Sequence, residues 1–176
     1  MHPSTIVAHR IRVRLGLPLL SEFLTYVHYQ DDGWACELVS RIAALVHDSV
    51  PHVWQIEINE RQAAAVCEAE RRGSTVTLDT LLRDPRDRGA YLPVIALLVE
   101  HQDARQIVPD TGRRLRKGDQ VLLCGREEAR YRMDWTLQDP RTLRYVRTGD
   151  ESHEGWFWRW AARLRRRRIP PEDARS

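Results

Sequence analysis

Segment 115–125, LRKGDQVLLCG, gathers three residue types that can do chemistry. It contains the only lysine of the chain, Lys117, together with Asp119 and Cys124. Nucleophilic catalysis requires a Ser or Cys that is activated by a base and an orienting group. Cys124 instead lies inside an apolar run, where loss of solvation raises the pKa of a thiol and makes it unreactive. The segment therefore predicts a turn that leads into a buried strand, and not a catalytic site.

The remaining titratable residues match no catalytic, cofactor or metal motif. The sequence has no G-x-S-x-G, no G-x-x-x-x-G-K-[ST] and no dinucleotide-binding G-x-G-x-x-G. Its three cysteines are far apart, which does not predict a disulfide framework or a zinc site. His47 and His52 can converge with Asp48 across Pro51, but an exposed loop is the favoured interpretation. We expect no enzymatic activity and no metal, and the sequence identifies no cofactor.

The basic charge is concentrated at the C-terminus. The 176 residues carry a net charge of +3, and residues 156–176 hold seven arginines against Glu172 and Asp173. Aromatic side chains beside clustered cations are typical of a segment on an anionic membrane surface. Clustered arginines also attract nucleic acid, although the near-neutral remainder of the chain disfavours that partner. A solvated tail is the third alternative. The residues predicted to contact a membrane surface are Trp156, Trp158, Trp160, Arg163 and Arg165.

Apolar periodicity predicts two short helices within residues 4–28 and a third at 36–47. Gly16 is suited to end the first helix, and Pro18 fits the first turn of the second. Two consecutive helices this apolar must pack on the body of the domain or on a second copy of the chain. We expect a homodimer that buries Leu19, Leu20, Phe23, Leu24 and Val27.

From residue 51 onward the pattern is mainly that of strands. Apolar character on both faces of segment 120–124 predicts a central strand, and Pro93 predicts an edge or a bulge near the start of another. Asp79 is expected to cap a single helical turn. The charged segment 83–89 predicts a loop whose arginines either neutralise their neighbours or clamp an anionic ligand. Strands are predicted at 53–58, 91–100, 105–109 and 120–124, with helices at 60–72, opened by a capping box at Asn59 and Gln62 and ended by Gly73, and at 126–138.

Helices followed by a β-helix-β-β-β pattern predict an α+β domain with a small, mostly antiparallel sheet and flanking helices. The order of these elements resembles the C-terminal lobe of RCK domains (the TrkA-C type), which regulate potassium channels and transporters. The matching segments are VWQIEI, LDTLL, LPVIALLVEH, QIVPD and LRKGDQVLLCG, followed by REEARYRM. The resemblance covers residues 1–149 and is strongest over 88–138. The segment MDWTLQDPRTLRYVRTG is similar to the C-termini of bacterial potassium channel proteins that carry RCK domains.

The resemblance implies that the first helices are crossover helices that bind a partner subunit. It also implies a ligand site near the end of the long strand, where some family members place a basic residue that contacts a nucleotide. The residues expected to bind a ligand are Glu100, His101, Pro109, Asp110, Arg83 and Arg86. Gly118, Asp119 and Gly125 are expected to form structural turns.

We therefore expect a cytoplasmic, non-enzymatic regulatory module at the inner face of the cell membrane. A nucleotide-binding lobe or a potassium channel pore would be supplied in cis or in trans. The alternative is a module that binds membrane surface or nucleic acid through the tail. The expected divisions are 1–30 (crossover and dimerisation helices), 31–50 (helical insertion), 51–138 (RCK C-lobe-like domain) and 139–176 (extension with the basic tail).

Overall fold

The computed structural model describes residues 17–102 and 104–150. The helix predicted before Gly16 and the basic tail lie outside the described residues. The described helices are α2 (Pro18–His28), α3 (Asp32–Val46), α4 (Ala64–Arg71), α5 (Leu78–Leu82), α6 (Glu127–Gln138) and α7 (Pro140–Thr148), and the strands are β1 (His52–Glu57), β2 (Arg83–Asp84), β3 (Asp87–Tyr91), β4 (Val94–His101), β5 (Ala104–Ile107) and β6 (Gln120–Gly125).

Four strands form the main sheet in the order β1-β6-β4-β5, and each neighbouring pair is antiparallel. Val121 of β6 lies opposite Ile56 of β1 on one side and Val99 of β4 on the other. The prediction that segment 120–124 forms a central strand is therefore confirmed. The combination of helices with a small antiparallel sheet is the α+β class expected from the sequence.

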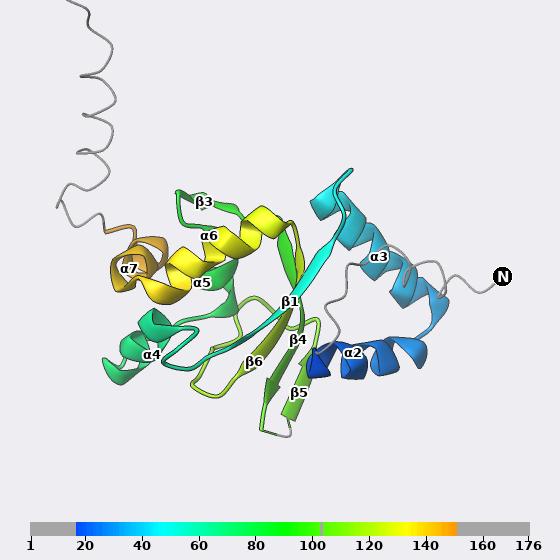
Figure 1. Cartoon of the computed structure of the whole chain (residues 1–176), viewed down its shortest axis with the longest axis horizontal. Coiled ribbons are helices and arrows are strands. Elements are labelled where there is room, and N and C mark those ends of the chain that lie inside the picture. The colour runs from blue at the N-terminus through cyan, green and yellow to red at the C-terminus, as the bar shows by residue number, and fades with distance from the viewer. Residues whose placement is uncertain (1–16, 103, 151–176) are drawn as a thin grey trace, which may run out of the picture.

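Helices cover both faces of this sheet, α2 and α3 on one side and α4 to α7 on the other (Figure 1). Successive residues of β6 alternate between the two hydrophobic clusters, as a strand with two buried faces requires. The cluster under α2 and α3 includes Leu19, Leu20, Phe23, Leu38, Val53, Ile95, Leu97, Leu98, Leu122 and Cys124. The opposite cluster includes Trp54, Ile56, Ile58, Val99, Val121, Leu123, Met133, Leu137 and Leu143.

A β-bulge in β4 decides which side chains enter each cluster. Pairing with β6 shifts between Ala96 and Leu98, so Leu97 is the extra residue. Leu97 and Leu98 consequently both lie in the cluster under α2 and α3, whereas Ala96 and Val99 belong to the opposite cluster. The bulge lies further along the strand than Pro93 predicted, and β4 is an internal strand rather than an edge.

Helix α2 packs on the sheet of its own chain. Leu19, Leu20 and Phe23 are 1%, 4% and 5% exposed and contact strands β1, β4 and β6 within one cluster. The expectation that these three side chains form a dimer interface is therefore corrected, since the body of the domain already covers them. Of the five predicted interface residues, Val27 is half-buried and Leu24 is 47% exposed.

The charged segment 83–89 forms the β2–β3 hairpin, so the prediction of a loop is wrong. Asp84 and Pro85 are buried at its turn. Arg132 of α6 donates to Asp84 Oδ2 at 2.9 Å, which joins the hairpin to a helix distant in sequence.

Helix α4 begins at Ala64, later than the predicted start of segment 60–72. Asn59 Oδ1 accepts the N–H groups of Arg61 and Gln62, as a capping residue does. The amide oxygen of Gln62, however, accepts the N–H of Glu57 in β1. The turn after β1 therefore replaces the predicted capping box, while Gly73 ends the helix region with φ of +72° as predicted.

Candidate functional site

The six residues predicted to bind a ligand do not converge on one site. Arg83 and Arg86 belong to the β2–β3 hairpin, whereas Glu100 and His101 lie at the end of β4 beside β5. Figure 1 shows the hairpin near the top of the view and β5 near its bottom, so the two lie well apart. The other two follow β5: Pro109 is buried, and the exposed Asp110 accepts the N–H of Gly112 at 2.7 Å.

The end of β4 is tied to the start of β6 by a buried carboxylate. Asp119 is 1% exposed, and its Oδ1 lies 2.7 Å from Nδ1 of His101. Its Oδ2 accepts the N–H of Arg116 at 2.9 Å, and the Arg113 guanidinium lies 3.5 Å from Oδ1. Buried carboxylates need such donors to offset the cost of desolvation. Asp119 therefore holds the turn and the strand end in one arrangement.

Glu100, the neighbour of His101, takes part in a second set of contacts. Arg105 of β5 donates to Glu100 Oε1 at 2.7 Å and lies 2.9 Å from Glu22 Oε2 of α2. A single guanidinium thus bridges the sheet and helix α2. This pairing occupies Glu100 but leaves His101 31% exposed at its side chain, accessible to a ligand.

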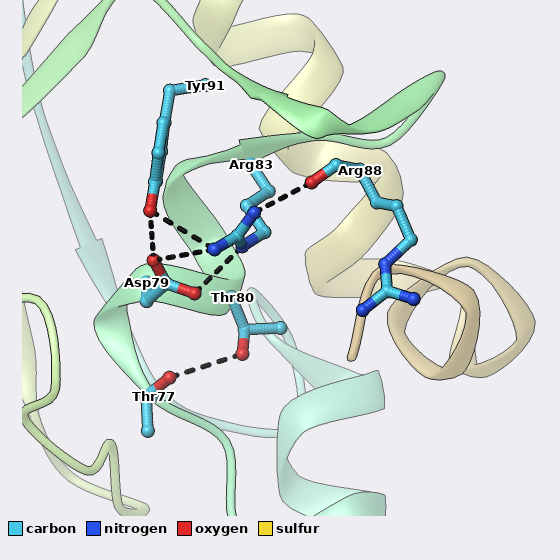
Figure 2. A network of polar contacts seen from close by, with 6 residues as sticks. All are labelled: Thr77, Asp79, Thr80, Arg83, Arg88 and Tyr91. Carbon is cyan, nitrogen blue, oxygen red and sulfur yellow. Dashed lines mark hydrogen bonds and ion pairs between the residues drawn. The ribbon is translucent and has the colours of Figure 1, made fainter. Parts of the chain in front are cut away.

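Arg83 belongs to a hydrogen-bond network that joins the β2–β3 hairpin to α5 (Figure 2). Its Nε donates to Asp79 Oδ2 at 2.8 Å, and its NH1 donates to the Arg88 carbonyl at 2.8 Å. NH2 donates to the Tyr91 hydroxyl at 3.1 Å, and that hydroxyl donates to Asp79 Oδ1 at 2.5 Å. Each guanidinium nitrogen already donates, so Arg83 acts here as a structural residue.

Asp79 accepts these bonds instead of capping α5, so its predicted role as a cap is corrected. Burial opposes ionisation of its carboxyl. The hydrogen bonds from Arg83 and Tyr91 outweigh that effect and lower the pKa of Asp79 below its ordinary value. The Tyr91 hydroxyl donates to the same carboxylate, which raises the pKa of Tyr91. The network therefore stabilises the ionised form of Asp79.

Arg86 is likewise paired within the hairpin. Its backbone N–H donates to Asp84 Oδ1 at 2.9 Å, and its guanidinium lies 3.4 Å from Asp84 Oδ2. Burial acts to raise the pKa of Asp84, but the bonds from Arg86 and the charge of Arg132 lower it overall. The interpretation in which the hairpin charges neutralise one another accordingly describes this segment better than an anion clamp does.

The thiols show no arrangement suited to nucleophilic catalysis. Burial raises the pKa of Cys124 to about 12 and also raises the pKa of Cys67. Cys36 is exposed on α3. Among residues 17–102 and 104–150, no three His, Cys, Asp or Glu side chains gather closely enough to hold a metal ion.

Of the predicted turn residues, Gly118 lies in the turn before β6, whereas Gly125 is part of strand β6, so its predicted role in a turn is corrected. Gly118 has φ of +91°, a backbone angle that glycine adopts readily, and its N–H donates to the Ile58 carbonyl at 2.8 Å. Gly125 packs directly against the backbone of Pro93 and Val94, where a Cβ would collide with main-chain atoms. Gly125 is therefore required by the close approach of β6 to the start of β4.

A cavity of about 320 Å³ lies elsewhere, between α4 and α7. Four arginines line it, and sequence reasoning did not identify them as a site. Three of these occur at every third position of α7, beside buried Leu143 and Val146. That spacing is the signal from which the charged face of α7 was predictable. The lining arginines are Arg72, Arg141, Arg144 and Arg147.

Two further observations bear on the sequence predictions. Trp156, Trp158, Trp160, Arg163 and Arg165 lie outside the described residues. Within the described part of the chain, every helix is too short or too polar to cross a membrane.

A scan against models of known protein families and a search of curated proteins both give no match. The function must be inferred from the residues themselves.

Proposed function

We propose that this chain is a non-enzymatic regulatory module that senses a ligand and controls potassium flux through a channel or uptake system. The proposal rests on the position of the segment GDQVLLCG in the fold. This segment forms a glycine turn and the central strand β6, beside the long strand β4 that ends at His101. Apart from the β2–β3 hairpin that follows α5, the order β1, α4, α5, β4, β5, β6, α6 also agrees with the order that the resemblance to the RCK C-terminal lobe implies.

The end of β4 is the proposed point of ligand sensing. His101 contacts Asp119 at the start of β6, and Glu100 contacts Arg105, which also reaches Glu22 of α2. A ligand that engages His101 would therefore act on contacts joining β4, β5, β6 and α2. The ligand would shift the equilibrium between two geometries of the module only by the difference in its binding free energy for them.

The proposed module works as a homodimer in which exposed apolar side chains of α2, α3 and the turn between them meet a second copy. Leu24 and Tyr29 are 47% and 79% exposed, and Tyr26 and Val39 are each 38% exposed. Exposed apolar side chains on successive elements of the chain favour an interaction surface. This surface replaces the buried residues Leu19, Leu20 and Phe23 in the sequence-based expectation.

Light scattering after size-exclusion chromatography tests the dimer. Leu24→Asp with Tyr29→Asp should convert a dimer to a folded monomer, because charges oppose burial of the surface. Thr25→Asp is the matched control, since it adds a charge to an exposed position of the same helix. A wild-type monomer at micromolar concentration would reject this surface as a dimer interface.

Rubidium uptake tests the regulatory role directly. Cells that lack the chain should take up rubidium at an altered rate, and the wild-type chain should restore it. His101→Ala should restore uptake only in part, while a thermal-shift screen of nucleotides and divalent ions on the purified chain identifies the ligand class. Equal uptake with and without the chain would reject the potassium function.

The alternative function is binding to an anionic membrane surface or nucleic acid through segment 156–176. Its support is the sequence of that segment, which combines three tryptophans with seven arginines. Sedimentation with anionic vesicles and a DNA pull-down, each with residues 156–176 deleted, tests this function. Binding that survives the deletion would show that the tail is not responsible.

A further inference from the structure

The cavity between α4 and α7 combines a basic rim with a small apolar floor. Ala65 and Ala69 of α4 line the cavity with short side chains, and α7 lies beside α4 (Figure 1). Leu143 and Pro140 supply the apolar wall on the α7 side, and Ser74 adds a hydroxyl just after the glycine turn. Its volume of about 320 Å³ lies at the lower end of the range typical of small-molecule sites.

The charges around this cavity are not balanced by the protein. Arg72, Arg141, Arg144 and Arg147 face a single acidic lining residue, Glu68, which already pairs with Arg72. In the part of the chain that the structure describes, neither Arg144 nor Arg147 forms an ion pair. The positive charge of Arg141 acts on Asp139, whose oxygens are occupied in capping α7.

The spacing of the α7 arginines places them side by side. Residues three apart on a helix are neighbours on its surface, so Arg141 adjoins Arg144, and Arg144 adjoins Arg147. Neighbouring like charges on a helix surface repel one another, and a bound anion would reduce this repulsion. Leu143 and Val146 of α7 are buried, which holds the helix and its arginines in place against the body of the domain.

We propose that the α4–α7 cavity binds a phosphate-bearing ligand. Guanidinium groups match phosphate oxygens through paired hydrogen bonds, which a simple halide cannot accept in the same way. The surplus of three positive charges suits a group with more than one phosphate, and the wall of Leu143, Pro140 and the two alanines accommodates an attached apolar portion. The proposal is independent of potassium regulation and of the site at His101.

Isothermal titration of the full chain with inorganic pyrophosphate at low salt is the first test. Wild-type protein should bind, and the affinity should fall as salt is added, because partly exposed charges are screened. Arg144→Gln with Arg147→Gln should weaken binding at least about tenfold, the loss expected for two charge-assisted contacts. Ala69→Leu fills the cavity without changing charge and should weaken binding as well.

Two exposed arginines that do not line the cavity provide the matched control. Arg114→Gln with Arg116→Gln removes the same charge there and should leave pyrophosphate affinity unchanged. Titration with ATP and sedimentation with phosphatidylglycerol vesicles then distinguish a soluble nucleotide from a lipid headgroup as the source of the phosphate. Absence of pyrophosphate binding, or equal affinity in wild type and both cavity variants, would overturn the proposal.

Discussion

His101 and Asp119 connect the end of β4 to the turn before β6 through a 2.7 Å contact between Nδ1 and Oδ1. The same carboxylate accepts the N–H of Arg116, and the carbonyl of Asp119 accepts the N–H of Ile58 just after β1. One buried residue therefore links three adjacent strands at one end of the sheet. A side chain that sequence reasoning placed in a turn also anchors the proposed ligand-sensing histidine.

Replacement of Asp119 with alanine should lower the free energy of unfolding by about 2–4 kcal/mol, because the variant leaves buried donors without an acceptor. Urea unfolding measures the difference. Lys117→Ala is the control in the same turn: Lys117 is 63% exposed and lies 3.7 Å from Glu60, so its loss should cost less than about 0.5 kcal/mol. Equal losses in both variants would contradict the anchoring role of Asp119.

Alanine substitutions at Gly125 and Gly73 should distinguish the cost of a steric collision from the cost of a strained backbone angle. Gly125→Ala places a Cβ against the backbone of Pro93 and Val94 and should cost about 1–3 kcal/mol, as overpacking does. Gly73→Ala meets no atom within 4 Å but must adopt φ of +72°, which should cost about 1 kcal/mol. Thermal unfolding of the two variants gives the comparison, and a Gly125 variant as stable as wild type would show that β6 can move away from β4.

The network around Asp79 predicts loss of stability in acid. Burial opposes ionisation of Asp79, but the hydrogen bonds from Arg83 and Tyr91 leave its pKa below the ordinary value. A carboxyl whose pKa is lower in the folded state stabilises the fold fully above the unfolded pKa of about 3.9, and this contribution disappears as the pH falls through the folded value. Asp79→Asn should therefore show a shallower fall in unfolding free energy between about pH 5 and pH 3 than wild type.

Urea unfolding at several pH values measures this slope. Asp84 and Asp139 also have lowered pKa values and remain in the variant, so part of the acid sensitivity should persist. The exposed Asp87→Asn is the matched control and should retain the wild-type slope. The same slope in Asp79→Asn and wild type would mean that the Arg83 and Tyr91 contacts do not stabilise the charge.

Helix α2 should contribute to the core of a single chain. Phe23→Ala should lower the free energy of unfolding by about 3 kcal/mol, because it opens a cavity between α2 and the sheet. Leu24→Ala, one position along and 47% exposed, should change it by less than about 0.5 kcal/mol. Chemical denaturation at protein concentrations too low for a dimer measures the free energy of unfolding of the single chain. A larger loss in Leu24→Ala than in Phe23→Ala would mean that α2 packs through another surface.

The central sheet was predictable because its signals are local. The apolar segment 120–124 identified β6 as internal, and the strand predicted at 53–58 corresponds to β1. Gly73 also gave the end of a helix region correctly. Each of these features follows from residues close together in the sequence.

The errors concern contacts between distant residues. In the β2–β3 hairpin, Asp84 pairs with Arg132 of α6, which lies 48 positions away in the sequence. Gln62 was expected to cap its own helix, but a strand N–H competes for the same oxygen. The apolar stripe of α2 is consistent with a dimer or with the sheet, and only the fold distinguishes them. The arginines at the α4–α7 cavity escaped notice because α7 meets α4 only in the tertiary structure.

Thiol labelling should distinguish the three cysteines. Cys36 is exposed, whereas Cys67 and Cys124 are 2% and 1% exposed and burial raises the pKa of both. Because only the thiolate is nucleophilic, a disulfide reagent at about pH 8 should modify one thiol quickly in the native protein and all three in denaturant. Cys36→Ser should abolish the fast phase. Rapid labelling of Cys124 in that variant would mean that α2 and α3 open readily from the sheet and expose β6.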